Sequence, residues 1–157
     1  MGGPAPRILK NDQGVEVLRM RGAPDTTLDQ AFDTVGFHLG KMQRQGVTTS
    51  VLSLLGSFCW IESQPVEVSL PLCKMVNDAM SRISQDYAGR FAVFGALPLT
   101  DMNAAAAELE RIMTLPGVVG VQVPGNLFLT KKHGEDARPL MEAANRTKAI
   151  VFVHHGP

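Results

Sequence analysis

Four short apolar segments, separated by stretches with helical spacing, constrain this chain more than any other feature of its sequence. They cover residues 47–55, 91–97, 118–123 and 149–153, and each is nearly continuous in aliphatic and aromatic residues. Strands that are buried on both faces have this pattern, which is typical of a parallel sheet. The sequence therefore predicts four strands in one parallel sheet.

Segments with helical periodicity precede and separate these strands. Helices are predicted over residues 28–45, 70–87, 103–114 and 138–145. The second helix is expected to bury an apolar stripe of Leu72, Met75, Val76, Ala79, Met80 and Ile83. In such a helix the residues that recur every three or four positions lie on one face. Strands that alternate with helices predict an α/β fold with parallel crossovers.

The first 26 residues differ in character from the rest. They are rich in Gly and Pro, and the segment ILKNDQGVEVL predicts a small hairpin that turns at residues 11–14. We therefore expect an irregular N-terminal segment over residues 1–26 and one α/β domain over residues 27–157. A length of 157 residues is sufficient for one domain with a buried core.

Composition argues against several classes of function. Fifteen basic residues balance fifteen acidic ones, so no positive field favours nucleic acid or an anionic membrane. No apolar run approaches the length of a membrane span, and the N-terminus has no apolar signal segment. Cys59 and Cys73 are expected to be free thiols rather than a disulfide. We therefore expect a soluble, cytoplasmic protein that binds neither nucleic acid nor membrane.

Polar and aromatic side chains follow the predicted strands at their carboxyl ends, where ligands bind in parallel α/β folds. The loop after the first strand holds Trp60 and Glu62, the loop after the third holds Lys131–His133, and the last strand delivers His154 and His155. Trp60 has two interpretations, a packed lid over the core or a wall of a substrate site. The lysines and His133 are expected to be solvated surface residues.

Strand geometry constrains the two terminal histidines. Successive side chains on a strand point to opposite faces. If Ile150, Phe152 and His154 share one face, His155 lies on the other. One imidazole is then expected to face the functional side, while the second supports it or turns outward as Gly156 bends the chain. The alternative is a strand-end histidine that is hydrogen-bonded at the surface.

Several ordered segments resemble the amidohydrolase superfamily, in the branch related to aminocarboxymuconate semialdehyde decarboxylase. These are RFAVFGALPLTDMNAAAAELERI, GVVGVQV and AIVFVHHGP, together with Gly46-Val47 at the start of the first strand. In that branch a strand ends in Leu-Pro-Leu before an alanine-rich helix with Glu-Leu, as Leu97–Leu99 and Glu108-Leu109 do here. The resemblance covers about Thr27 to Pro157.

This resemblance implies part of a (β/α)8 TIM barrel, about strands two to five, with a divalent metal, usually zinc, at its carboxyl mouth. The family holds that ion with a first-strand His-x-His or Glu-x-His pair, a fifth-strand histidine and an eighth-strand aspartate. His154 matches the fifth-strand ligand, and His155 stands where many relatives have proline. The first-strand pair has no counterpart, since Glu16 is followed by Val17 and Leu18.

The sites that follow are metal ligation at His154 and His155 and substrate contact at Trp60, with no catalytic residue assigned. The family implies a hydrolase or a non-oxidative decarboxylase for small carboxylate or cyclic substrates. A complete barrel needs at least about 200 residues, and a catalytic zinc needs about three protein ligands. We therefore expect an incomplete family member that is inactive alone, with open strand edges that favour homo-oligomers.

Two other hypotheses remain at this point. The first is a non-catalytic α/β interaction or oligomerisation domain, and the number of metal ligands would distinguish it from an enzyme. The second is an open flavodoxin-like sheet, which is disfavoured because no glycine-rich phosphate loop follows any of the strands.

Overall fold

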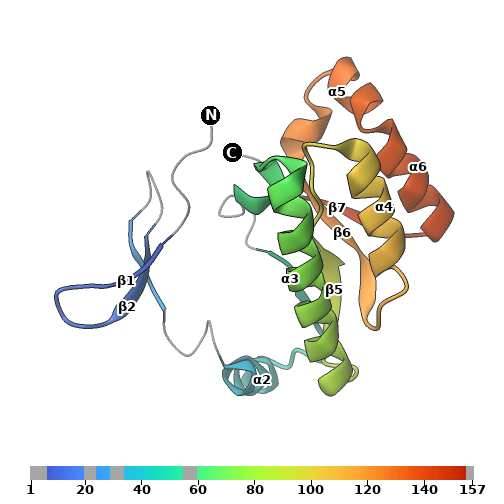
Figure 1. Ribbon diagram of the computed structural model, residues 1–157. Helices are drawn as coiled ribbons and strands as arrows, with labels where there is room; N and C mark the ends of the chain where they lie inside the picture. The colour runs from blue at the N-terminus through green and yellow to red at the C-terminus, as the bar shows by residue number, and fades with distance from the viewer. Residues whose placement is uncertain (1–6, 20–23, 29–33, 55–59, 155–157) are drawn as a thin grey trace. The chain divides into compact units, whose positions relative to one another are not determined.

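The computed structural model describes residues 7–19, 24–28, 34–54 and 60–154 (Figure 1). Two compact units make up the chain, residues 1–48 and residues 49–157. In the part of the chain that is described, no helix is both long enough and apolar enough to span a bilayer.

The described part of the first unit contains a small antiparallel sheet and the helix α2 (Val35–Arg44). The sheet has three strands, β1 (Arg7–Lys10), β2 (Glu16–Arg19) and β3 (Thr26–Thr27). The predicted hairpin is present, because Asn11 Oδ1 accepts the N–H groups of Gln13 at 3.0 Å and Val15 at 2.9 Å. Gly14 completes the turn at φ +77°, a conformation that favours glycine. The domain boundary at residue 26 stays a prediction.

The second unit is built on a four-stranded parallel sheet, as the sequence predicted. Its strands are β4 (Ser50–Leu52), β5 (Phe91–Gly95), β6 (Val118–Pro124) and β7 (Ile150–His154). They lie in the order β4-β5-β6-β7, and each neighbouring pair is parallel. Because every neighbouring pair is parallel, all the carboxyl ends lie along one edge of the sheet, and β4 and β7 are its two outer strands.

Helices connect these strands. They are α3 (Val66–Asp86), α4 (Met102–Ile112), α5 (Lys131–Asp136) and α6 (Arg138–Thr147), with 3-10 turns η2 (Trp60–Ser63) and η3 (Gly125–Phe128). Asp101 caps α4, since its Oδ1 accepts the N–H groups of Asn103 at 2.9 Å and Ala104 at 3.0 Å. The alternation of strand and helix therefore matches the sequence prediction.

Helix α5 corrects one expectation. Lys131–His133 were expected in a loop, but they form the first turn of this helix. Thr130 Oγ1 accepts the N–H of His133 at 3.1 Å and caps the helix. Lys132 Nζ pairs with Asp136 at 2.6 Å, a spacing of four residues that stabilises a helical turn. These short-range contacts explain a helix in a segment that has no apolar stripe.

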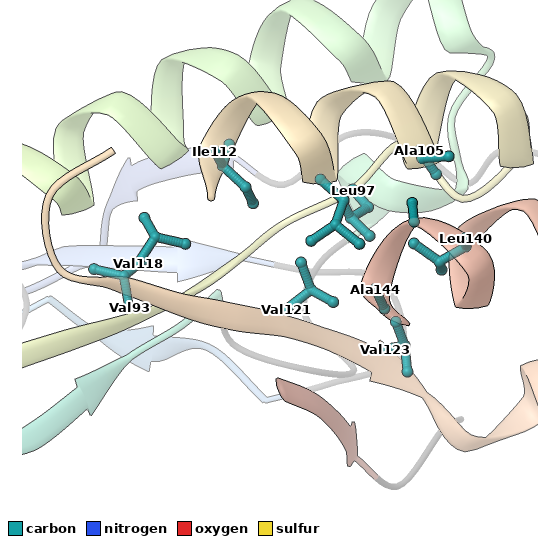
Figure 2. Close-up of a cluster of buried hydrophobic side chains, with 12 residues drawn as sticks. Val93, Leu97, Ala105, Ile112, Val118, Val121, Val123, Leu140 and Ala144 are labelled. Carbon is teal, nitrogen blue, oxygen red and sulfur yellow. The ribbon is translucent and has the colours of Figure 1, made fainter. Parts of the chain in front are cut away.

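The main core lies between one face of the sheet and helices α4 and α6, which pack side by side (Figure 1). Figure 2 shows its fully buried side chains, including Val93, Leu97, Ile112, Val121, Val123 and Leu140. Val121 and Val123 of β6 face these helices. Side chains alternate along a strand, so Gly120 and Gln122 face the opposite side of the sheet.

Helix α3 buries a face rotated from the predicted one: Met80 of the predicted stripe packs against the core, but Leu72, Val76 and Ile83 are only half-buried. Met75 of the predicted stripe is 60% exposed, and the buried residues are Ser69, Cys73, Asn77, Ser81 and Ser84. Small polar side chains let the helix approach the backbone of its neighbours. Ser84 Oγ donates to Phe91 O at 2.6 Å, and Ser81 Oγ donates to Pro116 O at 2.8 Å. Hydrogen bonds to strand and loop backbone therefore decide which face of α3 is buried.

Candidate functional site

His154 ends β7 at the carboxyl edge of the parallel sheet, as the sequence predicted. It pairs in register with Pro124, the last residue of β6. The half-buried imidazole lies edge-on to the Phe152 ring, with centroids 6.1 Å apart and an interplanar angle of 65°. His155 lies outside the described residues. Metal ligation by these two histidines therefore stays a prediction.

Two aromatic side chains lie near His154, on the face of the sheet away from helices α4 and α6. The rings of Phe94 and Phe152 stack at a centroid distance of 5.4 Å with an interplanar angle of 8°. They come from β5 and β7, on either side of β6, where Gly120 pairs in register with both Phe94 and Ile150. The glycine, which has no side chain, leaves this face open for the two rings to meet.

Gly120 also permits the close approach of β6 and β7. A Cβ atom at this position would lie 2.0 Å from the carbonyl oxygen of Ile150. That contact is to backbone, which a change of rotamer does not relieve. The position of β7, and so of His154, depends on this glycine.

Gln122 links the centre of the sheet to the segment that follows β4. Its side chain is buried on β6, and its Nε2 donates to Leu54 O at 3.1 Å. The same side chain shares a face with Phe152, its partner in register. The bond fixes the chain just after β4, at the edge where η2 begins.

Among the described residues, Glu62 in η2 is the acidic group with the largest change in pKa. Burial raises its pKa to about 7, and a hydrogen bond from the Leu97 backbone opposes the shift. The backbone oxygen of Glu62 accepts the N–H of Leu99 at 3.0 Å. Burial, with a smaller effect of Glu62, also raises the pKa of the Cys73 thiol to about 12, so this free cysteine is an unreactive thiol at neutral pH.

A buried polar network holds the end of β5. Asn77 Oδ1 accepts the N–H of Ala96 at 2.8 Å, and Asn77 Nδ2 donates to Ala96 O at 2.9 Å. The same amide donates to Glu108 Oε1 at 2.9 Å, and both Glu108 oxygens accept from Arg111 at 2.8 Å. Arg111 also donates to Asp78 at 2.8 Å. Asn77 thus replaces a neighbouring strand for Ala96, at the point where β5 passes into its loop.

The remaining residues singled out in the sequence have less direct links to the site. Trp60 begins η2, in the connection from β4 to α3, and the structure describes its backbone only. Substrate contact by Trp60 stays a prediction. Lys131 and Lys132 are exposed and pair with Glu135 and Asp136 within α5. The expectation that these lysines are solvated is therefore confirmed.

In the described part of the chain, the residues around His154 fall short of what a metal site needs. There, no three His, Cys, Asp or Glu side chains are grouped so that they could hold a metal ion. A catalytic ion needs about three protein ligands. The described residues therefore do not fit a complete metal site, and His154 is a single candidate ligand at its edge.

Two curated relatives are decarboxylases. The 2-amino-3-carboxymuconate-6-semialdehyde decarboxylase of Dictyostelium discoideum is 25% identical over 114 residues, which are 73% of this chain and 32% of that protein. The gamma-resorcylate decarboxylase of Rhodococcus jostii is 33% identical over 94 residues, which are 59% of this chain and 28% of that protein. The chain spans about a third of the length of the curated relatives it matches.

Solved structures share the fold of the second unit. The 5-carboxyvanillate decarboxylase of Novosphingobium aromaticivorans, in complex with manganese and 4-hydroxy-3-methoxy-5-nitrobenzoic acid, matches with a TM-score of 0.67 and 19% identity. The match covers 75% of this chain and 33% of that protein. The second unit is thus part of a (β/α)8 barrel, as expected. The amidohydrolase family model matches residues 62–157, more than half of the sequence, and the chain belongs to the amidohydrolase family.

Proposed function

We propose that this chain forms part of a metal-dependent, non-oxidative decarboxylase that acts on small aromatic or other cyclic carboxylates. The position of His154 carries the proposal, because it lies at the carboxyl end of β7 in a parallel sheet. Ligands bind at that edge in barrels of this kind. Decarboxylases among the relatives favour loss of carbon dioxide over the hydrolysis that the family also performs.

His154 is proposed as one ligand of a divalent ion, either zinc or manganese, with His155 as a second ligand or a support. The manganese in a related structure supports a divalent ion without favouring zinc. Trp60 is proposed as an apolar wall against a planar substrate. The donors in the described residues do not complete a metal site, so we propose that this chain is inactive alone.

Paramagnetic broadening by Mn²⁺ in NMR spectra of the isotopically labelled chain tests the role of His154. We expect Mn²⁺ to broaden the resonances of His154 and Phe152 first, and His154→Ala to abolish this effect. His133→Ala is the matched control, because His133 lies in α5 and should leave the broadening unchanged. Broadening that persists in His154→Ala, or that disappears in the control, would show that His154 is not the ligand.

Enzyme assay tests the second half of the proposal. The isolated chain, supplied with Mn²⁺ or Zn²⁺, should release no carbon dioxide above the uncatalysed rate from gamma-resorcylate, the compound in the name of the Rhodococcus jostii relative. Release that depends on His154 would support decarboxylase chemistry and contradict the proposed inactivity. Release that is unaffected by His154→Ala would contradict the assignment of the site.

An interaction or oligomerisation domain is the second candidate function, and one observation favours it. Large apolar side chains are exposed on the outer strands of the sheet: Val51 46%, Ile150 53%, Phe152 43% and Val153 51%. Parallel strands in such barrels are normally covered on both faces. This candidate predicts association through β4 and β7, and the homo-oligomer expected from the sequence belongs to it.

The expected location and partners also remain proposals. We propose a cytoplasmic protein whose partner is a small molecule, and the balanced charge argues against nucleic acid or an anionic membrane as a partner.

A further inference from the structure

The loop that leaves β5 is held in place by its own contacts. Asn77 binds both backbone groups of Ala96, because its Oδ1 accepts the N–H at 2.8 Å and its Nδ2 donates to the carbonyl oxygen at 2.9 Å. The next residue, Leu97, is completely buried. The N–H of Asp101 donates to Pro98 O at 3.2 Å, and the Asp101 side chain caps α4. These contacts make the loop a fixed support at the carboxyl end of β5.

Two hydrogen bonds hold η2 against this loop. The N–H of Leu99 donates to the backbone oxygen of Glu62 at 3.0 Å, and Thr100 Oγ1 donates to Gln64 O at 2.8 Å. Both acceptors are backbone carbonyl groups, one in η2 and the other in the residue that follows it. The last carbonyl groups of a helix have no partner within that helix and need donors from elsewhere. The β5 loop supplies these donors.

Of these two bonds, the one from Thr100 is made by a side chain and can be removed without a change in the backbone. Thr100 is exposed, so its substitution leaves the core intact. Trp60 lies two residues before Glu62 in the same 3-10 turn. A displacement of η2 from the loop would therefore move Trp60 with it.

We propose that Thr100 is a positioning residue, whose hydroxyl group docks η2 on the β5 loop and so sets the position of Trp60. The two segments follow the carboxyl ends of β4 and β5, on the edge of the sheet where His154 ends β7. The consequence for a substrate rests on the proposed function, in which Trp60 is a wall of the site, whereas the docking does not. Loss of one neutral hydrogen bond should raise the undocked population of η2 about fivefold.

Hydrogen exchange measured by NMR tests the docking, because the Leu99 amide exchanges when its bond to Glu62 opens. Thr100→Val removes the hydroxyl group and keeps the shape of the side chain, so we expect exchange of Leu99 to become about fivefold faster. Thr100→Ser keeps the hydroxyl group and should keep the rate of the unmodified chain. Thr114→Val is the matched control, because it removes a similar exposed bond, from Thr114 Oγ1 to Arg111 O at 2.7 Å, and should leave Leu99 unchanged.

The indole N–H of Trp60 tests the second part of the proposal. Trp60 is the only tryptophan in the chain, so this group gives a single NMR signal. The signal should shift in Thr100→Val and keep its position in Thr100→Ser and Thr114→Val, because the hydroxyl group that binds Gln64 is lost in the first variant alone. These spectra are recorded without metal or substrate, so their outcome is distinct from that of the Mn²⁺ test of His154.

Three results would overturn the proposal. Leu99 exchange that is unchanged in Thr100→Val would show that the hydroxyl group does not dock η2. An equal increase in Thr114→Val would assign the effect to a general loss of stability. Faster exchange of Leu99 with an unchanged indole signal would show that the docking does not position Trp60.

Discussion

At the scale of single residues, Glu62 should make folding stability depend on pH. Its pKa is about 7 in the folded chain, against 4.5 in the reference state. An acidic group whose pKa is raised on folding makes its full contribution to the free energy of unfolding below its unfolded pKa. That contribution is lost as the pH rises through the folded pKa. Between about pH 4.5 and pH 7.5, this group should therefore lower the free energy of unfolding by up to about 3 kcal/mol.

Urea unfolding of the chain and of Glu62→Gln checks this prediction. The difference in free energy of unfolding between the two should change steadily with pH, and Glu62→Gln should be the more stable at pH 8. Glu67→Gln should follow the unmodified chain. A constant difference across this pH range would mean that the Glu62 carboxyl titrates normally.

The network around Glu108 gives a second prediction at this scale. Glu108 is fully buried, and Arg111 neutralises it. Arg111→Leu leaves an unpaired buried carboxylate, so we expect a loss of about 3–5 kcal/mol in the free energy of unfolding. Arg146→Leu is the control, because its pair with Glu110 is exposed and should cost less than about 1 kcal/mol. Thermal or urea unfolding measures both, and equal effects would contradict a special role for the buried pair.

At the scale of elements, Gly120 determines how closely β7 approaches β6. Gly120→Ala places Cβ against the Ile150 carbonyl, so we expect several kcal/mol of destabilisation and displacement of β7. Gly134→Ala is the matched control, because a Cβ there meets no atom within 4 Å and alanine favours α5. Circular dichroism melts compare the two variants. A Gly120→Ala chain as stable as the control would show that the strands can separate without cost.

The elements themselves were predictable to different degrees. The strands followed from continuous apolar runs, because strands covered on both faces need apolar side chains at every position. For α3, periodicity predicted a helix but only part of its buried face, since Ser81 and Ser84 are buried through hydrogen bonds to backbone outside the helix. Helix α5 was missed because a cap at Thr130 and ion pairs, rather than an apolar stripe, hold it.

At the scale of the whole molecule, the outer strands of the second unit should make the chain self-associate. β4 and β7 have apolar, exposed side chains and are the outer strands of the sheet among the described residues. We expect sedimentation velocity to show concentration-dependent oligomers, and Phe152→Lys to reduce them. Leu129→Lys is the control, because Leu129 is exposed away from the sheet strands and should leave association unchanged. A monomer at all concentrations would contradict this prediction.

Part of the candidate site could also be predicted from sequence. The placement of His154 followed from one rule, that parallel strands present their carboxyl ends at one edge. The raised pKa of Glu62 could not be predicted, because it depends on burial in the folded chain. The role of Gly120 could not be predicted from the sequence either. Only the register of β5, β6 and β7 shows that the Phe94 and Phe152 rings meet beside it.

The relative direction of β6 and β7 decides whether His154 lies at the carboxyl edge. Nuclear Overhauser effects between the two strands measure this direction most directly. The parallel register predicts contacts between Val121 and Val151 and between Val123 and Val153. An antiparallel arrangement would instead connect Val121 with Val153 and Val123 with Val151. We predict the first set of contacts. The second set would show that β7 runs in the opposite direction, with His154 away from the edge where a ligand binds.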